Sequence, residues 1–243
     1  MKYTRNYINQ SLRLGSVLLL SRQASQHMVK VLRKEVGSLI EVFDGRGSRW
    51  HAKILNVKSA LVEIEVISES IYKEREGIKI ILGQTLIKPD PFSFSIQKAT
   101  ELGVHTISPL ISDRTVVNIK KESLEKRLHK WSLISQGACE QCGEDWMPVI
   151  EPPQRTSDWS KSVATDTKIV LYPGGRSSIT SIKIKDSIAV AIGPEGDFTD
   201  NEIQVLEKDG FVPVSMGQRI LRAETATISA LSVIVVALTT PVT

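Results

Sequence analysis

The chain has 243 residues, a net charge of +4 and a hydrophobic content of 41%, which suffices for a real core and leaves one large or two modest domains. Residues 1–72 hold 11 Lys and Arg against 6 Asp and Glu, whereas residues 73–243 hold 20 against 21. The basic excess therefore belongs to the first part. It predicts binding to a polyanion there, the alternative being an ordinary solvated basic surface.

Residues 1–72 are predicted to form a small β-rich domain. Several short runs alternate in hydrophobicity as half-buried strands do, and Asp44-Gly45 between two of them is a strong hairpin signal. A short helix is expected at residues 25–33, and strands are expected at residues 12–20, 39–43, 51–57 and 61–66. The basic side chains that we expect nearest to phosphate are Arg5, Arg13, Lys30, Arg33, Arg46 and Arg49.

Residues 68–77 are polar and charged and form the best linker candidate, after which strands alternate with helices. Asp90 is expected to cap a helix that Pro91 starts and Gly103 ends. A longer helix is expected at residues 122–140, and strands are expected at residues 78–87, 104–111, 168–172, 187–192 and 211–215. This alternation predicts a mostly parallel sheet.

The strand at 187–192 leads into the loop Gly193-Pro194-Glu195-Gly196. A glycine on each side of Pro-Glu leaves backbone amides and carbonyls uncovered, so a flat heterocycle can be hydrogen-bonded at its edge. The alternative is an ordinary turn between a strand and a helix, because a lone glycine-rich turn is a weak signal. Thr199 and Glu202 then form a capping-box pattern that predicts the start of the next helix.

A second loop, residues 216–225, follows the strand at 211–215 and carries Arg219, Arg222 and Glu224. Guanidinium groups suit phosphate or a developing anion, and Glu224 can orient Arg222 or steer a proton. The alternative is a structural ion pair between Arg222 and Glu224, with the Ile-Leu pair between the arginines filling the core. Paired loops of this kind, at the carboxyl ends of neighbouring strands, are where an α/β sheet binds a small molecule.

The last nineteen residues, 225–243, carry no charge. Their length just permits a membrane span, but threonines and serines interrupt the first half and Pro241 interrupts the end. We therefore expect this segment to be buried in a core or in a subunit contact.

Cys139 and Cys142 form a lone CxxC, and nothing in the sequence completes a four-ligand zinc site around them. A redox pair is the alternative to two reduced thiols, which helical spacing beside a core helix favours. The polar residues at the amino end are unlike a secretory signal, so we expect a cytoplasmic protein.

Taken together, the motifs resemble those of the bacterial 16S ribosomal RNA uridine-N3 methyltransferase family, a branch of the SPOUT class of S-adenosylmethionine-dependent enzymes. The resemblance runs through most of the chain. Besides the two loops, it rests on Val31-Leu-Arg33, Val42-Phe-Asp-Gly45, Ile96-Gln-Lys-Ala-Thr-Glu-Leu-Gly-Val104 and Ala138-Cys-Glu-Gln-Cys-Gly143. Two departures are Asp197, where a second glycine is common, and Asp90-Pro91-Phe92, where a more polar segment is usual.

The resemblance implies an α/β fold with two domains. Residues 1–72 would be a PUA-like RNA-binding β-barrel, and residues 73–243 a SPOUT methyltransferase domain whose mostly parallel sheet ends in a trefoil knot. It also implies a homodimer whose interface contains the last helix, and a reaction without a metal. The implied activity is methyl transfer from S-adenosylmethionine to N3 of a uridine in 16S ribosomal RNA of the 30S subunit, the family target being position 1498.

On this reading the cofactor lies against three short segments. The expected cofactor-binding residues are Leu171, Tyr172, Pro173, Ile192, Gly193, Pro194, Glu195, Gly196, Met216, Gly217, Ile220 and Leu221. Arg222 is expected to stabilise the charge that develops on the uracil carbonyl oxygens, with Glu195 or Glu224 as proton acceptor or as its orienting partner.

Two other classes of function stay open. One is a nucleotide hydrolase that uses the first loop to bind phosphate, although no lysine or Ser/Thr metal ligand follows that loop in the Walker pattern. The other is an RNA-binding or assembly factor without catalytic activity.

Overall fold

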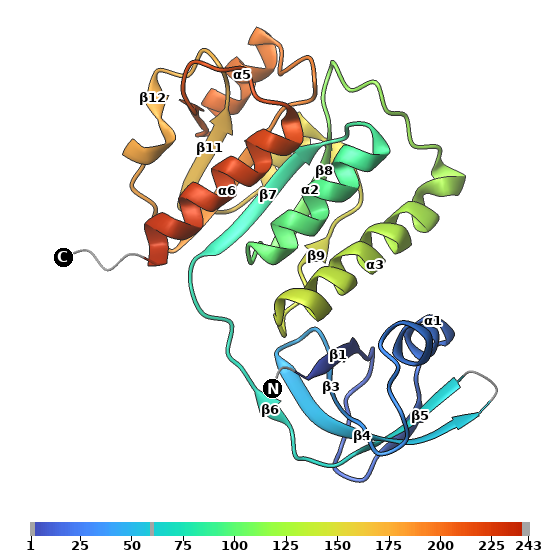
Figure 1. The fold of residues 1–243 in the computed structure, drawn as a ribbon. Helices are drawn as coiled ribbons and strands as arrows, with labels where there is room; N and C mark the ends of the chain where they lie inside the picture. Colours follow the sequence, from blue (N-terminus) through green and yellow to red (C-terminus); the bar gives the residue numbers. More distant parts are fainter. Residues whose placement is uncertain (1–2, 59–60, 240–243) are drawn as a thin grey trace. The chain divides into compact units, whose positions relative to one another are not determined.

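The computed structural model describes residues 3–58 and 61–239, which form two compact units (Figure 1). The first unit comprises Met1–Arg75 and Cys139–Met147, and the second comprises Glu76–Ala138 and Pro148–Thr243. The sequence assigns everything after residue 72 to the second domain. The segment Cys139–Met147 groups with the first unit instead, because its backbone and side chains bind Arg5 and Tyr7 of the first strand.

The first unit contains one mixed sheet in the order β1-β3-β4-β5-β2, with β6 paired to β4. Its strands are β1 (Thr4–Tyr7), β2 (Val17–Leu19), β3 (Leu39–Phe43), β4 (Ser48–Lys58), β5 (Leu61–Val66) and β6 (Ile71–Tyr72). A short helix, α1 (Arg22–Gln26), continues directly into a π-helical turn, η1 (His27–Val31).

The predicted strands at 39–43 and 61–66 and the hairpin at Asp44 are confirmed. The Asp44 carboxylate holds the turn by accepting hydrogen bonds from the backbone amides of Arg46, at 2.8 Å, and Ser48, at 3.1 Å. The predicted strand at 12–20 shortens to Val17–Leu19. The reason is a turn at its start, where Gly15 has a φ of +79° and the Ser16 hydroxyl accepts from the Arg13 amide. The expected linker contains β6.

The second unit contains a sheet in which every recorded pairing is parallel, in the order β10-β8-β7-β13-β11-β14-β12, with β9 also paired to β8. The mostly parallel sheet expected from the sequence is thus present. Its strands are β7 (Lys79–Thr85), β8 (Thr106–Ile111), β9 (Val149–Ile150), β10 (Gln154–Arg155), β11 (Thr167–Leu171), β12 (Ser177–Ser178), β13 (Ser187–Ile192) and β14 (Val212–Ser215).

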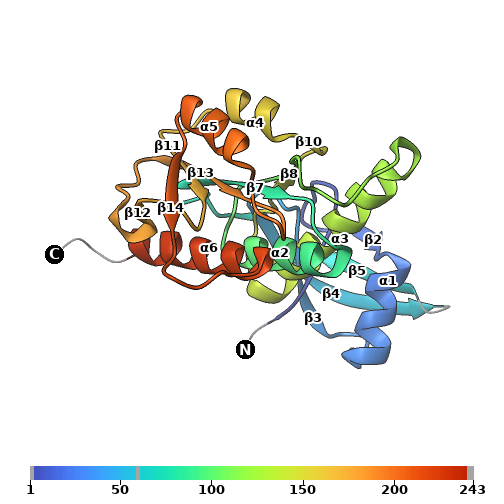
Figure 2. The same ribbon diagram turned by 90° about the horizontal axis from the view of Figure 1, so that it is seen from above.

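Helices cover both faces of this sheet (Figure 2). The α-helices of this part of the chain are α2 (Pro89–Glu101), α3 (Leu124–Cys142), α4 (Thr156–Ser162), α5 (Asp200–Lys208) and α6 (Ala223–Thr239); the 3-10 turns are η2 (Lys121–Ser123) and η3 (Ile179–Ser181). One face packs against α2 and α6 and the other against α4 and α5. Residues alternate between the two cores along each strand, so that Ile80 and Leu82 belong to one core and Ile81 to the other.

The structure confirms one predicted helix start and contradicts another. The capping box at Thr199 and Glu202 is confirmed, with the Thr199 hydroxyl accepting from the Glu202 amide at 3.2 Å. The prediction that Asp90 caps its helix was wrong. Lys88 is the N-cap residue of α2, because Pro89, whose φ suits the first helical position, already begins the helix and leaves Asp90 in the first turn.

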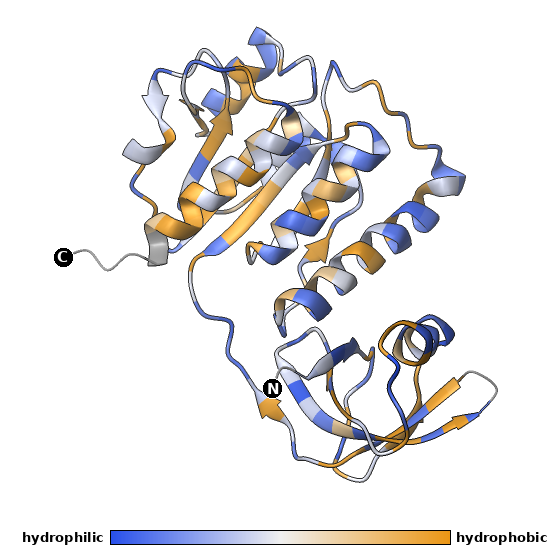
Figure 3. Ribbon diagram, in the orientation of Figure 1, coloured by the Kyte–Doolittle hydropathy of each residue, from blue (hydrophilic) through white to orange (hydrophobic). Residues whose placement is uncertain are grey.

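Helix α6 takes up most of the uncharged segment at the end of the chain, and it packs against α2. Thr227, Ala230, Leu231 and Ile234 of α6 are buried, in keeping with the expected burial in a core. Figure 3 shows the apolar residues concentrated on β7 and on the later turns of α6. Pro241 lies outside the described residues. Among the helices that the structure describes, none is long and apolar enough to cross a membrane.

Strand β14 lies between two strands that are consecutive in the sequence, β11 and β12. Leu171 of β11 and Ser177 of β12 both lie beside Val214 of β14. Strand β14 therefore lies between β11 and β12, which only residues 172–176 join in sequence. After β14 the chain returns to α6, which packs against α2 beside β7 (Figure 1). Residues 172–176 and 216–222 consequently meet at the carboxyl ends of these strands.

Candidate functional site

A pocket lies at the carboxyl ends of β11, β13 and β14, the edge at which an α/β sheet binds small molecules. Three loops and the start of α6 form its walls. The lining residues are Leu171, Tyr172, Pro173, Ile192, Gly193, Pro194, Glu195, Asp197, Val214, Met216, Gly217, Arg219, Ile220, Leu221, Ala223 and Ala226. Their arrangement follows from the fold, because parallel strands end at one edge of a sheet.

All the cofactor-binding residues expected from the sequence except Gly196 line this pocket. Gly196 faces the neighbouring segment instead: its carbonyl oxygen accepts a hydrogen bond of 2.6 Å from Nη1 of Arg114. Sequence reasoning missed Asp197, Val214, Ala223 and Ala226 as lining residues. Helical spacing could have indicated Ala223 and Ala226, because they are the small residues of the first turn of α6.

The first loop is held in shape by its own backbone and by Asp197. The Asp197 amide donates to the Pro194 carbonyl at 2.9 Å, and Asp197 adopts a left-handed backbone with a φ of 61°. Its Oδ1 accepts from the Phe198 amide at 2.8 Å. A Cβ atom on Gly193 would lie 2.9 Å from that Oδ1, so the Asp197 carboxylate occupies the space that glycine leaves open.

A buried carboxylate ties this loop to the end of β8. Glu202, only 9% exposed, accepts from the Thr199 amide at 2.8 Å through Oε2 and from the Asp113 amide at 2.9 Å through Oε1. Arg114, next to Asp113, then reaches the Gly196 carbonyl. The first loop is thus supported from the helix that follows it and from the segment that follows β8.

Polar side chains beneath the pocket fix two of its walls. The Thr85 hydroxyl donates to the carbonyl of Ile192, at the end of β13, at 2.9 Å. The Thr227 hydroxyl binds Gln84 and the carbonyl of Ala223, the latter at 2.8 Å. Gln84, Thr85 and Thr227 are all buried. The signal that could have revealed them is the presence of two polar residues at the end of the otherwise apolar strand β7.

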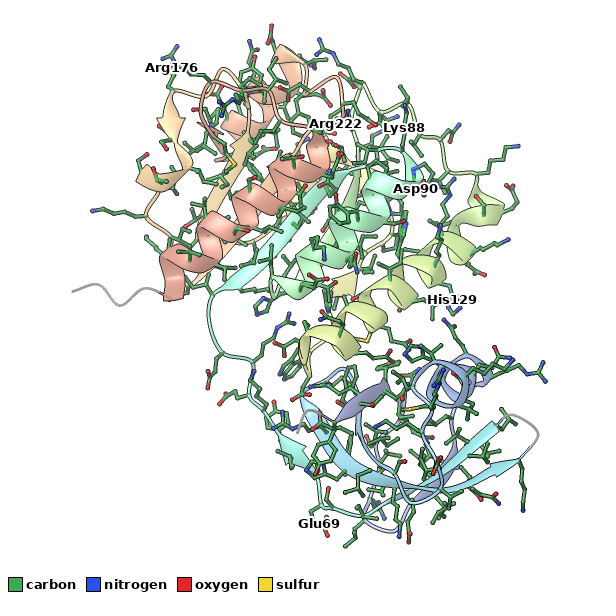
Figure 4. The ribbon with its side chains drawn as sticks, viewed as in Figure 1. Glu69, Lys88, Asp90, His129, Arg176 and Arg222 are labelled. Carbon is green, nitrogen blue, oxygen red and sulfur yellow. The ribbon has the colours of Figure 1, made fainter. Side chains whose placement is uncertain are left out.

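The second loop is more open than expected. Ile220 is 88% exposed, so it does not fill the core as the alternative reading supposes. Arg222 is exposed at the amino end of α6 (Figure 4). Within the described residues no ion pair joins Arg222 to Glu224. The structure therefore gives no support to a structural ion pair in this loop.

Of the three expected catalytic residues, one lines the pocket and two are next to lining residues in the chain. Glu195 lines it, and its Oε1 accepts from the Lys88 amide at 3.4 Å. Arg222 and Glu224 are not lining residues, but their neighbours Leu221 and Ala223 are. Glu195 thus connects the pocket to the start of α2, and Arg222 directly follows the lining residue Leu221.

Of the six basic residues expected to bind phosphate, Arg5 is unsuitable. It is 9% exposed, and its guanidinium donates to Oδ1 of the fully buried Asp145 at 2.5 Å. It also pairs with Glu41 at 3.2 Å and donates to the Gly143 carbonyl at 2.6 Å. We assign Arg5 a structural role, because both of its Nη groups are engaged inside the first unit.

The other five differ in accessibility. Arg49 is about one-third exposed and pairs with Asp145 at 2.9 Å. Arg46 is exposed and lies 3.7 Å from a carboxylate oxygen of Asp44. Arg13, Lys30 and Arg33 are exposed.

Cys139 and Cys142 are both thiols. Cys139 is buried, and burial raises its pKa to about 12. Its Sγ lies 3.7 Å from the Trp146 carbonyl oxygen. Such a thiol is poorly suited to redox or metal chemistry, which need the thiolate.

Comparison with known proteins gives consistent matches over both units. The model of an RNA methyltransferase domain matches residues 74–235, and that of an RNA methyltransferase PUA domain matches residues 20–65. The ribosomal RNA small subunit methyltransferase E of Buchnera aphidicola (subspecies Schizaphis graminum) is 34% identical over 94% of each chain.

Two solved structures are similar over 98% of each chain. One, from Legionella pneumophila, is described as a methyltransferase in complex with the bound cofactor S-adenosylmethionine, with 36% identity and a TM-score of 0.92. The other is the ribosomal RNA small subunit methyltransferase E of Neisseria gonorrhoeae bound to S-adenosylmethionine, with 29% identity and a TM-score of 0.88.

Proposed function

The chain belongs to the ribosomal RNA small subunit methyltransferase E family, and we propose that it transfers a methyl group from S-adenosylmethionine to N3 of a uridine in 16S ribosomal RNA. The family target is uridine 1498 of the small subunit. The observation that carries this proposal is the pocket at the ends of β11, β13 and β14, which gathers nearly all the cofactor-binding residues expected from the sequence.

The pocket suits S-adenosylmethionine chemically. Its floor is apolar at Leu171 and Val214, as a purine ring requires, and Gly193 and Gly217 expose backbone groups that can read the edge of that ring. The lining also contains two carboxylates, Glu195 and Asp197. They outnumber Arg219, the one guanidinium in the described lining, so the charge of the lining favours a sulfonium and an ammonium group over a nucleoside triphosphate.

A bound S-adenosylmethionine supplies a methyl group that its positive sulfur already activates. Uridine N3 holds a proton and is a poor nucleophile until that proton leaves, so the protein must favour the anion. Glu195 or Glu224 accepts the N3 proton, and the Arg222 guanidinium stabilises the negative charge on the uracil carbonyl oxygens. Bound S-adenosylmethionine would supply the methyl carbon for the new bond to the N3 electron pair, and its sulfur would keep the electron pair of the broken bond. Positioning supplies much of the remaining acceleration.

For the fold we propose the trefoil knot of the SPOUT class. The support is the position of β14 between β11 and β12, because residues 216–222 must pass the short connection 172–176 on their way to α6. We also propose that the sheet of the first unit curves into a PUA-like barrel that binds the RNA, with Arg13, Lys30, Arg33 and Arg46 facing phosphate.

We further propose a homodimer in which α6 packs at the interface. The support is that Val236 is 61% exposed on a helix that carries no charge after its first turn. Because the substrate is a ribosomal subunit, we place the protein in the cytoplasm. Analytical ultracentrifugation tests the dimer directly, and a monomer at micromolar concentration contradicts it.

The experiment that tests the function is nucleoside mass spectrometry of 16S RNA from a strain that lacks the protein. We expect 3-methyluridine to be missing from its 30S particles and to reappear when protein and S-adenosylmethionine are added. Retained 3-methyluridine in that strain contradicts the proposal. Calorimetry with S-adenosylmethionine and ATP separates the alternatives, since a hydrolase should prefer ATP and an RNA-binding factor should bind neither.

A further inference from the structure

Asp197 is the most enclosed of the charged side chains that line the pocket. Glu195 and Arg219, the other two in the described lining, are exposed, whereas Asp197 is half-buried. Charges in such a setting act more strongly on a ligand than exposed charges do, because less water screens them.

The carboxylate is also fixed in place. Its backbone has a φ of 61°, an uncommon conformation for a residue other than glycine, and Oδ1 is held by the Phe198 amide at 2.8 Å. The same oxygen lies 2.9 Å from the place where a Cβ on Gly193 would be, so it lies over the bare backbone of the pocket wall. The group therefore keeps a defined position without help from a ligand.

The surroundings act on the charge of Asp197 in opposite directions and raise its pKa on balance. Burial raises the pKa of Asp197, the Phe198 hydrogen bond and the positive charge of Arg114 lower it, and the negative charge of Glu202 raises it. Arg114 itself is engaged with the Gly196 carbonyl at 2.6 Å. The burial is partial, so the charge of Asp197 is tested at pH 8, well above the ordinary carboxyl pKa of 3.8.

We propose that Asp197 makes the pocket discriminate between the methyl donor and its spent product by charge, which rests on the function proposed above. The sulfonium of S-adenosylmethionine is positive, whereas the same sulfur in S-adenosylhomocysteine is a neutral thioether. The adenosine and amino acid parts of the two molecules are identical. A fixed carboxylate in the wall therefore favours the donor and weakens binding of the product, which helps the product to leave after each transfer.

The test compares wild type and Asp197→Asn by calorimetry at pH 8 with each ligand. Asparagine tolerates the left-handed backbone and keeps an oxygen for the Phe198 amide, so the loop should stay folded. We expect the affinity for S-adenosylmethionine to fall about ten-fold and that for S-adenosylhomocysteine to change less than about three-fold. Sinefungin, which carries an amine-bearing carbon in place of the sulfonium, should lose affinity as the donor does.

The control is Asp200→Asn, since Asp200 lies three residues further on and outside the described lining, and asparagine can still accept the Tyr172 hydroxyl bond. It should leave the ratio of the two affinities unchanged. Equal losses for donor and product in Asp197→Asn, or no loss for either, overturn the inference while leaving the proposed function standing. A wild-type chain that does not bind S-adenosylmethionine overturns both.

Discussion

Replacing Arg5 with alanine separates a structural arginine from one that binds RNA. Arg5 and Asp145 are almost inaccessible to water, and Arg5 is the closer of the two cations that neutralise Asp145. The variant leaves a fully buried carboxylate with Arg49 alone, which is itself about one-third exposed. Breaking a buried ion pair by removing one partner costs about 3–5 kcal/mol. That is a large share of the roughly 5–15 kcal/mol that holds a typical domain together.

Hydrogen–deuterium exchange measures this loss separately for each unit. A destabilisation of about 3 kcal/mol speeds exchange through global opening by about 100-fold or more. We expect that acceleration for amides of β3 and β4 in the first unit, while those of β13 in the second unit keep their wild-type rates. The β13 amides thus provide an internal control.

The matched variant is Arg13→Ala, because Arg13 is exposed in the same unit. Its stability should change by less than about 0.5 kcal/mol. Its RNA affinity should fall, and the logarithmic salt dependence of binding should lose about one unit of slope. Wild-type exchange of β3 and β4 in Arg5→Ala would refute the structural assignment of Arg5.

Three further predictions concern the pocket and the thiols. Arg222→Ala should leave the affinity for S-adenosylmethionine within a few-fold while single-turnover methylation falls by about 100-fold or more, and wild-type turnover would remove Arg222 from the mechanism. Burial raises the pKa of Asp197, so the affinity for S-adenosylmethionine should be highest above that pKa and should fall as the pH drops through it. Calorimetry from pH 8 to 4 should show a flatter pH profile for Asp197→Asn, and parallel profiles for the two proteins would count against a role of the Asp197 charge. Since the pKa of Cys139 is raised to about 12, iodoacetamide at pH 8 should label the exposed Cys142 before Cys139. Peptide mass spectrometry measures both labels, and equal labelling in the folded protein would contradict the burial of Cys139.

The second unit was largely readable from its sequence because its signals are local. The strand at 187–192, the capping box at Thr199 and the helix stop at Gly103, which has a φ of +76°, each follow from neighbouring residues. The two loops also carried their own signal, since each follows an apolar strand. Parallel strands ending at one edge then bring the loops together.

What the sequence did not reveal depends on contacts between distant residues. The strands β9, β10 and β12 have two residues each, too few for a period, and exist because β8 and β14 offer partners. Arg5 is a plausible phosphate ligand from the sequence, because nothing near it reveals its partner Asp145, which lies 140 residues further along the chain. Asp197 looked like a small departure from the family pattern, and only its left-handed backbone and its closeness to Gly193 reveal a fixed charge in the pocket.

The most direct test of the account is a crystal structure of this chain soaked with S-adenosylmethionine. We predict density for the methyl donor between the three segments that line the pocket, with the face of its adenine ring over Leu171 and Val214 and its sulfur on the side of Asp197. Density for the donor at another site, or a pocket that stays empty at concentrations where calorimetry detects binding, would contradict the account.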